Sequence, residues 1–373
     1  MTHKPAMLGR DDLDELTRPH EGAVVTLLMT EVPAEAGRIL LKNLGRTAGA
    51  VLEDHGMRSV EVAEMLAPVE RVLTHHETWA APRVSLSVLV RRDAWWAAPG
   101  PPLGEPGCFV GSRFQVKHLL DRTGEGRFSA LALSRKRTTL YRGRAGSLEE
   151  VDGEHFPTSM EEVLRFADRE PQLQLHATGR QGGRAVAAFH GHGADPRPHE
   201  EDLLRFLRHV SAGVDAELEG EPLVLAATEE MSAAFRKVSD YRALLPDTVP
   251  GSGERHSLPE LAEAAWSLTT VDAARRRDAL RHDIEELSGQ ATTDLEETVA
   301  AAHDGRVEAI LVAGDEVLPG EYDAAHRMIR DAGPGTDLLN VAACETWRHG
   351  GDVFVVAAAD IPGDAGIAAT LRY

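Results

Sequence analysis

The residues best suited to chemistry lie in one glycine-rich stretch, residues 178–199. His190 and His192 are two positions apart, and on an extended backbone such side chains point to one face, where they could contact a phosphate or a metal ion. Asp195 and His199 follow closely. This spacing does not assign the remaining ligands of a zinc site, so we predict no metal and no other cofactor. Contact with RNA and ordinary loop packing are both open for the two histidines.

The same stretch carries an amide and three arginines. Gln181-Gly182-Gly183 places a hydrogen-bonding side chain beside two glycines, which let the backbone approach a substrate closely. Arg180, Arg184 and Arg197 could hold phosphate oxygens, because guanidinium groups match them in geometry. Long loops inside compact domains are usually functional or mobile. Two interpretations are open: a loop that reaches a substrate, and a flexible linker between a strand and a helix.

Other kinds of chemistry find little support. Cys344 lies in an apolar helical pattern with no histidine at motif spacing, which predicts a buried cysteine rather than a nucleophile. Trp95 and Trp96 are expected to anchor a core, with stacking on bases as the alternative. No phosphate-binding loop, dinucleotide fingerprint or nucleophile elbow occurs. Nucleotide hydrolysis and dinucleotide redox chemistry are therefore not indicated.

The distribution of charge restricts how the protein could bind nucleic acid. The chain has 60 acidic and 40 basic residues, a net charge of −20, which argues against coating DNA or RNA non-specifically. Any contact with RNA must therefore be made by a limited basic part of the surface. Between Arg113 and Arg144, nine Lys or Arg face only two acids, and Arg135, Lys136 and Arg137 form a polar turn. This run is either a solvated hairpin face or a surface that faces phosphate.

Composition also indicates where the protein works. Cys108 and Cys344 are far apart and outside any Cys-x-x-Cys pair, so neither a disulfide framework nor a structural zinc site is expected. Acidic residues stand where a signal peptide would be apolar, and no apolar run reaches the roughly 18 residues of a membrane span. We expect a cytoplasmic protein that does not bind membranes.

Hydrophobic periodicity and breakers divide the 373 residues into three expected domains, residues 1–113, 114–270 and 271–373. The expected strands cover residues 23–29, 83–90, 128–133, 138–142, 222–227, 307–313, 353–357 and the C-terminus. The expected helices cover residues 35–53, 60–73, 115–122, 200–218, 231–244, 258–266, 271–287, 294–302, 322–329 and 337–348. Since the last residues are small, apolar and β-prone, we expect the C-terminus to be held in a sheet. Alternating strands and helices predict α/β layers.

Several short motifs, taken in order, resemble one family. Residues 304–312, 350–356 and 366–373 look like the C-terminal domain of the archaeo-eukaryotic peptide-chain release factor and Pelota family. Residues 131–134, 140–143, 206–208, 222–226 and 260–266 are similar to elements of the family's central domain. The whole chain most resembles the bacterial relatives of that family.

The resemblance implies an α/β and α+β multidomain fold. It consists of an N-terminal α+β domain, a central ribonuclease-H-like domain and a C-terminal L7Ae-like α/β/α sandwich. It also implies work near the ribosomal A site, with the ribosome, rRNA or peptidyl-tRNA as partner and a translational GTPase as a further one. In releasing members, a Gly-Gly-Gln loop places a water against the peptidyl-tRNA ester.

Two departures from the family pattern concern its chemistry. Gln181-Gly182-Gly183 has the three residue types of the Gly-Gly-Gln loop in reversed order, so these candidate catalytic residues argue against peptidyl-tRNA hydrolysis. Residues 38–44 do not align with the stop-codon-reading motif, so codon reading is unsupported. We predict a ribosome-associated factor with a rescue, release-like or hibernation role. The alternatives are a stand-alone hydrolase of an RNA or ester substrate that uses residues 179–199, and a non-catalytic protein-binding adaptor.

Overall fold

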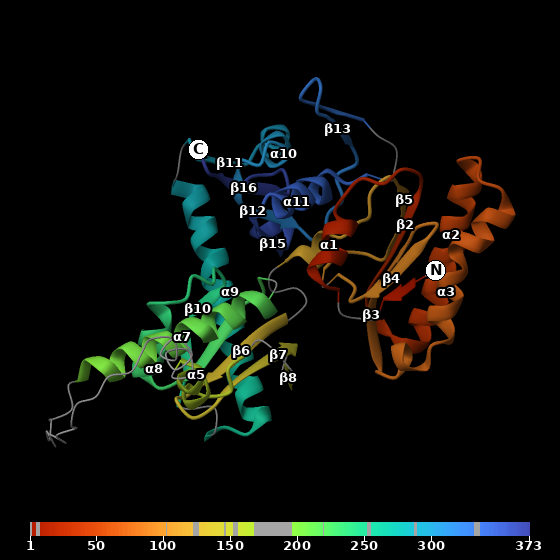
Figure 1. The fold of residues 1–373 in the computed structure, drawn as a ribbon. Coiled ribbons are helices and arrows are strands. Elements are labelled where there is room, and N and C mark those ends of the chain that lie inside the picture. The colour runs from red at the N-terminus through yellow and green to blue at the C-terminus, as the bar shows by residue number, and fades with distance from the viewer. Residues whose placement is uncertain are drawn as a thin grey trace, which may run out of the picture. The chain divides into compact units, whose positions relative to one another are not determined.

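The computed structural model forms two compact units, one made of Met1–Glu125 and Ala273–Tyr373, the other of Gly126–Asp272 (Figure 1). The structure describes residues 2–4, 8–101, 103–121, 127–144, 147–151, 156–167, 196–218, 220–251, 255–286, 289–331 and 336–373. No described helix is both long and apolar enough to cross a membrane.

The first sheet of the first unit has the strand order β1-β4-β3-β2-β5. Its strands are β1 (Thr2–Lys4), β2 (Val24–Pro33), β3 (Arg83–Val90), β4 (Ala94–Ala98) and β5 (Gly107–Gly111). The helices before and between them are α1 (Arg10–Leu16), α2 (Ala34–Asp54) and α3 (Ser59–Thr74). Because side chains alternate along β2, Val25, Leu27 and Met29 pack in one core with Leu41 of α2 and Val69 of α3. This agrees with the α+β pattern expected for the N-terminal region.

The second sheet of the first unit has the order β11-β16-β12-β15. Its elements are β11 (Ala291–Thr292), α10 (Leu295–His303), β12 (Val307–Ala313), α11 (Leu338–Arg348), β15 (Asp352–Val356) and β16 (Ile367–Leu371). The C-terminal strand β16 pairs with both β11 and β12. The backbone N–H of Arg372 continues the pairing by donating to the carbonyl of Arg306 at 2.8 Å. The prediction that a sheet holds the C-terminus is confirmed.

The sheet of the second unit has the order β10-β9-β6-β7-β8. Its strands are β6 (Arg127–Leu133), β7 (Thr138–Arg144), β8 (Ser147–Glu150), β9 (Leu223–Ala227) and β10 (Leu244–Pro250). Its helices are α5 (Met160–Ala167), α7 (Pro196–Glu217), α8 (Glu229–Arg236) and α9 (Leu258–Glu286). Leu131 and Leu133 pack on the side of α7 and α8, while Phe128 and Ala130 pack with α9. The sheet is thus covered on both faces, and the multidomain α/β architecture is confirmed.

Four expected helices differ from the structure. The helix expected over residues 231–244 is shorter, because α8 covers Glu229–Arg236 and Leu244 already begins β10. Residues 258–266 and 271–287 are not two helices but parts of the single helix α9, because no glycine or proline separates them and the Thr269 hydroxyl donates to the carbonyl of Ala265 inside the helix. Residues 322–329 form the hairpin β13 (Glu321–Asp323) and β14 (Met328–Arg330) instead of a helix. The carboxylate of Asp323 accepts hydrogen bonds from the backbone N–H groups of Ala325 and His326, which favours a turn over a helix.

The segment that follows residue 113 packs within the first unit. Phe114, Val116, Leu119 and Leu120, from the segment that ends in α4 (Lys117–Leu120), are buried in the core of the first unit. The same core contains residues of β12 and α11. The three-domain division and the ribonuclease-H-like and L7Ae-like assignments stay predictions.

Candidate nucleic-acid interface

The predicted site residues fall into two groups. Arg135, Lys136 and Arg137 lie in the described turn between β6 and β7, and Arg197 lies in the first turn of α7, although its side chain is not described. The others lie outside the described residues: Arg180, Gln181, Gly182, Gly183, Arg184, His190 and His192. Their roles stay predictions. Across the described ranges, no three His, Cys, Asp or Glu side chains are grouped as a metal site.

The turn between β6 and β7 is closed by its own backbone. The N–H of Ser134 donates to the carbonyl of Arg137 at 2.9 Å, and the N–H of Arg137 donates to the hydroxyl of Ser134 at 2.9 Å. The carbonyl of Arg135 accepts from the N–H of Met160, the first residue of α5, at 3.0 Å. These bonds hold the three consecutive cations in one place at the edge of the second unit.

The three cations are exposed and weakly engaged. Arg135 pairs with Glu230 at 2.8 Å, with the two side chains 58% and 72% exposed. Arg137 donates to the Thr139 hydroxyl at 3.2 Å, and its nearest carboxylate, that of Glu150, is 3.9 Å away. Lys136 has no polar partner among the described residues. Exposed pairs of this kind contribute about 0–1 kcal/mol, so the guanidinium groups can exchange them for phosphate oxygens at little cost.

The basic run from Arg113 to Arg144 does not form one surface. Arg113 pairs with Glu345 at 2.8 Å, and Lys117 pairs with Asp337 at 2.9 Å. These two cations of the run are therefore neutralised by carboxylates of the first unit. Arg142 donates to the carbonyl of Glu217 at 2.6 Å. The local excess of positive charge counted from the sequence is therefore larger than the charge that the second unit presents.

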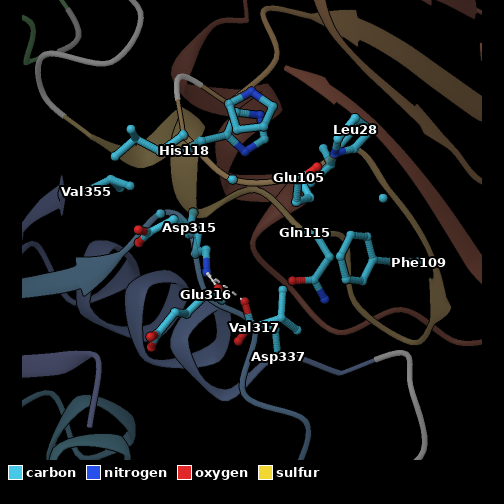
Figure 2. A pocket seen from close by; sticks show the side chains of 17 residues that line it. Leu28, Glu105, Phe109, Gln115, His118, Asp315, Glu316, Val317, Asp337 and Val355 are labelled. Atoms are coloured by element: carbon cyan, nitrogen blue, oxygen red, sulfur yellow. Dashed lines mark hydrogen bonds and ion pairs between the residues drawn. The ribbon is translucent and has the colours of Figure 1, made fainter. Parts of the chain in front are cut away.

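A buried histidine that the sequence analysis did not single out lies in the first unit. His118 (Figure 2) is 4% exposed. Its Nε2 lies 2.8 Å from the hydroxyl oxygen of Ser87. Burial, which disfavours the charged ring, is the main cause that lowers the pKa of His118 to about 3. The ring is therefore neutral at neutral pH and acts as a hydrogen-bonding group of the core.

This histidine predicts a specific pH dependence of stability. In the unfolded chain His118 takes up a proton below about pH 6.5, whereas in the folded chain it does so only near pH 3. Between these values the unfolded state binds more protons, so acid lowers the free energy of unfolding by about 1.4 kcal/mol per pH unit. We expect His118→Gln to flatten the curve between pH 6.5 and 5, measured by urea unfolding. The exposed His55→Gln variant should keep the wild-type slope, and equal slopes in all three proteins would contradict the prediction.

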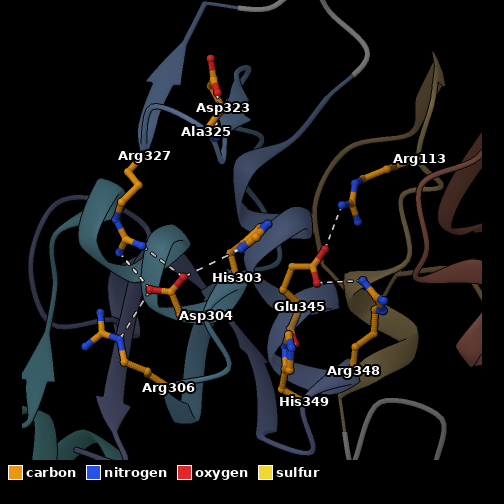
Figure 3. Close-up of polar contacts among 10 residues, drawn as sticks. All are labelled: Arg113, His303, Asp304, Arg306, Asp323, Ala325, Arg327, Glu345, Arg348 and His349. Atoms are coloured by element: carbon orange, nitrogen blue, oxygen red, sulfur yellow. Dashed lines mark hydrogen bonds and ion pairs between the residues drawn. The ribbon is translucent and has the colours of Figure 1, made fainter.

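Polar side chains of the C-terminal region pair with one another and with Arg113 (Figure 3). Asp304 accepts two hydrogen bonds from Arg327, at 3.2 and 2.9 Å, and this partner holds the pKa of the Asp304 carboxyl below its usual value. The carboxylate of Glu345 lies between Arg113 and Arg348. The Arg372 guanidinium donates to the carbonyls of Gly305 and His349. Asp304 and Arg372, which lie in the stretches that resemble the release factor family, are thus engaged in contacts within the fold.

Cys344, Trp95 and Trp96 are buried core residues. Burial raises the pKa of Cys344 to about 12 and that of Cys108 to about 11, so neither is a thiolate at neutral pH. Trp95 is 3% and Trp96 1% exposed, and the Trp96 indole N–H donates to Asp12 at 3.1 Å. The predictions of a buried Cys344 and of tryptophans anchoring a core are confirmed.

Comparison with known proteins relates the chain to one family. Residues 127–306 match the family described as "Bacterial archaeo-eukaryotic release factor family 3". No curated protein matches the chain.

Solved structures similar to the chain include the archaeal translation termination factor aRF1, with 14% identity, coverage of 97% of this chain and 96% of that one, and a TM-score of 0.24. Dom34 of S. cerevisiae, described as a translation termination-like factor, has 10% identity, coverages of 78% and 73% and a TM-score of 0.34. Pelota of Archaeoglobus fulgidus has 14% identity, coverages of 97% and 92% and a TM-score of 0.23. With TM-scores this low, the three likenesses carry no argument about function.

Proposed function

Since the chain is a relative of the archaeo-eukaryotic release factors through residues 127–306, we propose that it is a ribosome-associated translation factor that acts at the A-site region. The family match is the observation that carries the proposal. It covers the second unit, which also presents the exposed cations of the β6–β7 turn. Its proposed role is to rescue stalled ribosomes, to act in a release-like manner or to support ribosome hibernation. We propose that it does so in the cytoplasm.

We do not extend the proposal to hydrolysis of peptidyl-tRNA. The order Gln181-Gly182-Gly183 does not place an amide after two glycines, and these residues lie outside the described part of the chain. Contact of the ribosomal RNA with Arg180, Arg184, His190, His192 and Arg197, and recruitment of a translational GTPase, are carried forward as predictions from the resemblance. Nothing in the described residues specifically supports the alternative functions of a stand-alone hydrolase or a protein-binding adaptor.

The β6–β7 turn provides the test of ribosome binding. In the variant Arg135→Ala/Lys136→Ala/Arg137→Ala, we expect ribosome affinity to fall roughly tenfold at low salt, because exposed cations gain affinity by releasing counterions from phosphate. The dependence of log affinity on log salt should become less steep by up to about three, one for each lost phosphate contact. Co-sedimentation with purified ribosomes at several salt concentrations measures both.

A matched control removes three exposed cations elsewhere in the same unit: Arg205→Ala/Arg208→Ala/Lys237→Ala. It changes net charge equally, so a general electrostatic effect would weaken both variants alike. Loss confined to the turn variant supports the proposed surface. Equal loss in both, or none in either, contradicts a role for the turn, and no association of the wild-type protein at low salt refutes ribosome binding altogether.

A further inference from the structure

A cavity of about 200 Å³ lies in the first unit, between the segment before β5 and the segment after β12 (Figure 2). Its apolar wall includes Leu28, Phe109 and Val355. The two segments meet at Gly104, where φ is +97° and an added Cβ would lie 2.8 Å from the carbonyl oxygen of Gly314. A side chain there would push the segments apart, so this close approach favours glycine.

One polar side chain in the wall lacks a partner. Gln115 is only 4% exposed and lines the cavity, and its amide Nε2 has no hydrogen-bond partner among the described residues. Its backbone is fixed, because its N–H donates to the Thr26 hydroxyl at 3.1 Å. A buried amide without a partner costs about 1–3 kcal/mol. Rotation of the side-chain amide can turn either its NH₂ or its carbonyl oxygen toward a bound molecule.

The charges around the cavity are mostly negative. The carboxylates of Glu105, Asp315 and Glu316 belong to exposed residues of its lining. The lining cation Lys117 is already neutralised, since its ammonium donates to Asp337 at 2.9 Å and to the carbonyl of Glu316 at 2.6 Å. The exposed carboxylates favour a cation and repel phosphate.

We infer that this cavity binds a small organic amine, with its apolar body against Phe109 and Val355, a polar atom on the Gln115 amide, and its ammonium attracted by the exposed carboxylates of the lining. A volume of about 200 Å³ suits a molecule smaller than those bound in the ~300–1,000 Å³ pockets of drug-sized ligands. Nucleotides and RNA are excluded from the site by their phosphates. The inference is independent of ribosome binding, because it concerns the first unit and a ligand of opposite charge to RNA.

Binding is tested with the full chain in the absence of ribosomes. Titration calorimetry and thermal unfolding would compare three amines, phenethylamine, isoamylamine and agmatine, with the neutral 2-phenylethanol and the anion phenylacetate. We expect saturable binding of at least one amine together with a rise in Tm, because a ligand that binds only the folded state stabilises it. The neutral analogue should bind more weakly and the anion not at all. Absence of binding by all three amines, or binding of phenylacetate as strong as that of phenethylamine, would overturn the inference.

Variants locate the bound amine. Glu105→Gln/Glu316→Gln removes two exposed charges and should weaken amine affinity roughly fivefold. Gln115→Leu should weaken it by a similar factor through loss of the amide hydrogen bond. Glu321→Gln, an exposed carboxylate on β13 that does not line the cavity, serves as the control and should leave affinity unchanged. If Glu105→Gln/Glu316→Gln binds the amine as tightly as the wild-type protein does, the proposed site is wrong. This test does not depend on whether Gln115→Leu folds.

Discussion

Replacing Asp337 by alanine is expected to lower the unfolding free energy of the first unit by about 3–5 kcal/mol. Asp337 is 1% exposed and precedes the first residue of α11. One carboxylate oxygen accepts from the N–H groups of Leu318 and Leu339, at 3.0 and 3.1 Å, and the other accepts from the Lys117 ammonium at 2.9 Å. Without the carboxylate, a buried cation loses its counter-charge and two backbone donors lose their acceptor.

The measurement is denaturant unfolding followed by tryptophan fluorescence in a Trp266→Phe background. Trp266 is the tryptophan of the second unit, so the remaining signal comes from Trp79, Trp95, Trp96 and Trp347 of the first. Asp294→Ala is the matched control, because Asp294 is an exposed N-cap whose carboxylate accepts from the N–H of Glu297 at 2.8 Å with no buried cation. It should cost only about 1 kcal/mol. A loss for Asp337→Ala no larger than for this control would show that the ion pair contributes nothing.

Replacing Asn340 by alanine is expected to cost about as much, roughly 3–5 kcal/mol, through three unsatisfied backbone groups. Asn340 is fully buried on α11. Its side-chain oxygen accepts from the N–H groups of Val116 and Lys117 at 2.7 and 2.9 Å, and its amide donates to the carbonyl of Phe114 at 2.9 Å. One side chain therefore satisfies the backbone of the segment that enters α4.

Hydrogen exchange distinguishes this effect from general destabilisation. In Asn340→Ala, the amides of Val116 and Lys117 should lose protection more than those of β12, because their acceptor is removed directly. The exposed Asn43→Ala variant on α2 should change stability by less than about 0.5 kcal/mol. Uniform loss of protection across the first unit, or full retention at Val116 and Lys117, would contradict the assigned role.

Local signals predicted most elements well because each is determined by neighbouring residues. The strand over residues 83–90 and the strand over residues 307–313 match β3 and β12. The helices expected from Asp294 and Asp337 begin one residue later, since each aspartate is the N-cap. Prediction was wrong for residues 322–329, where the side chain of Asp323 accepts backbone hydrogen bonds and competes with the helical pattern.

The candidate interface was only partly predictable for a similar reason. A polar turn between two β-type runs indicated that Arg135, Lys136 and Arg137 would be exposed, and they are. The same count of charges included Arg113 and Lys117, whose partners Glu345 and Asp337 are more than two hundred residues away in the chain. Sequence spacing carries no information about such pairs, so a count of charges along the chain overstates the positive charge that the second unit presents.

The sequence by itself determined the periodicity of the helices and strands, the β-type C-terminus and the resemblance to the release factor family, because these depend on residue types and their order. Only the tertiary structure decided that residues 114–120 pack with α11, that His118 is held neutral, and that Gln115 faces a cavity with an acidic lining. The physical reason is that burial and ion pairing arise when distant segments meet, and they change the charge and hydrogen bonding of a residue without any change in its neighbours in the chain.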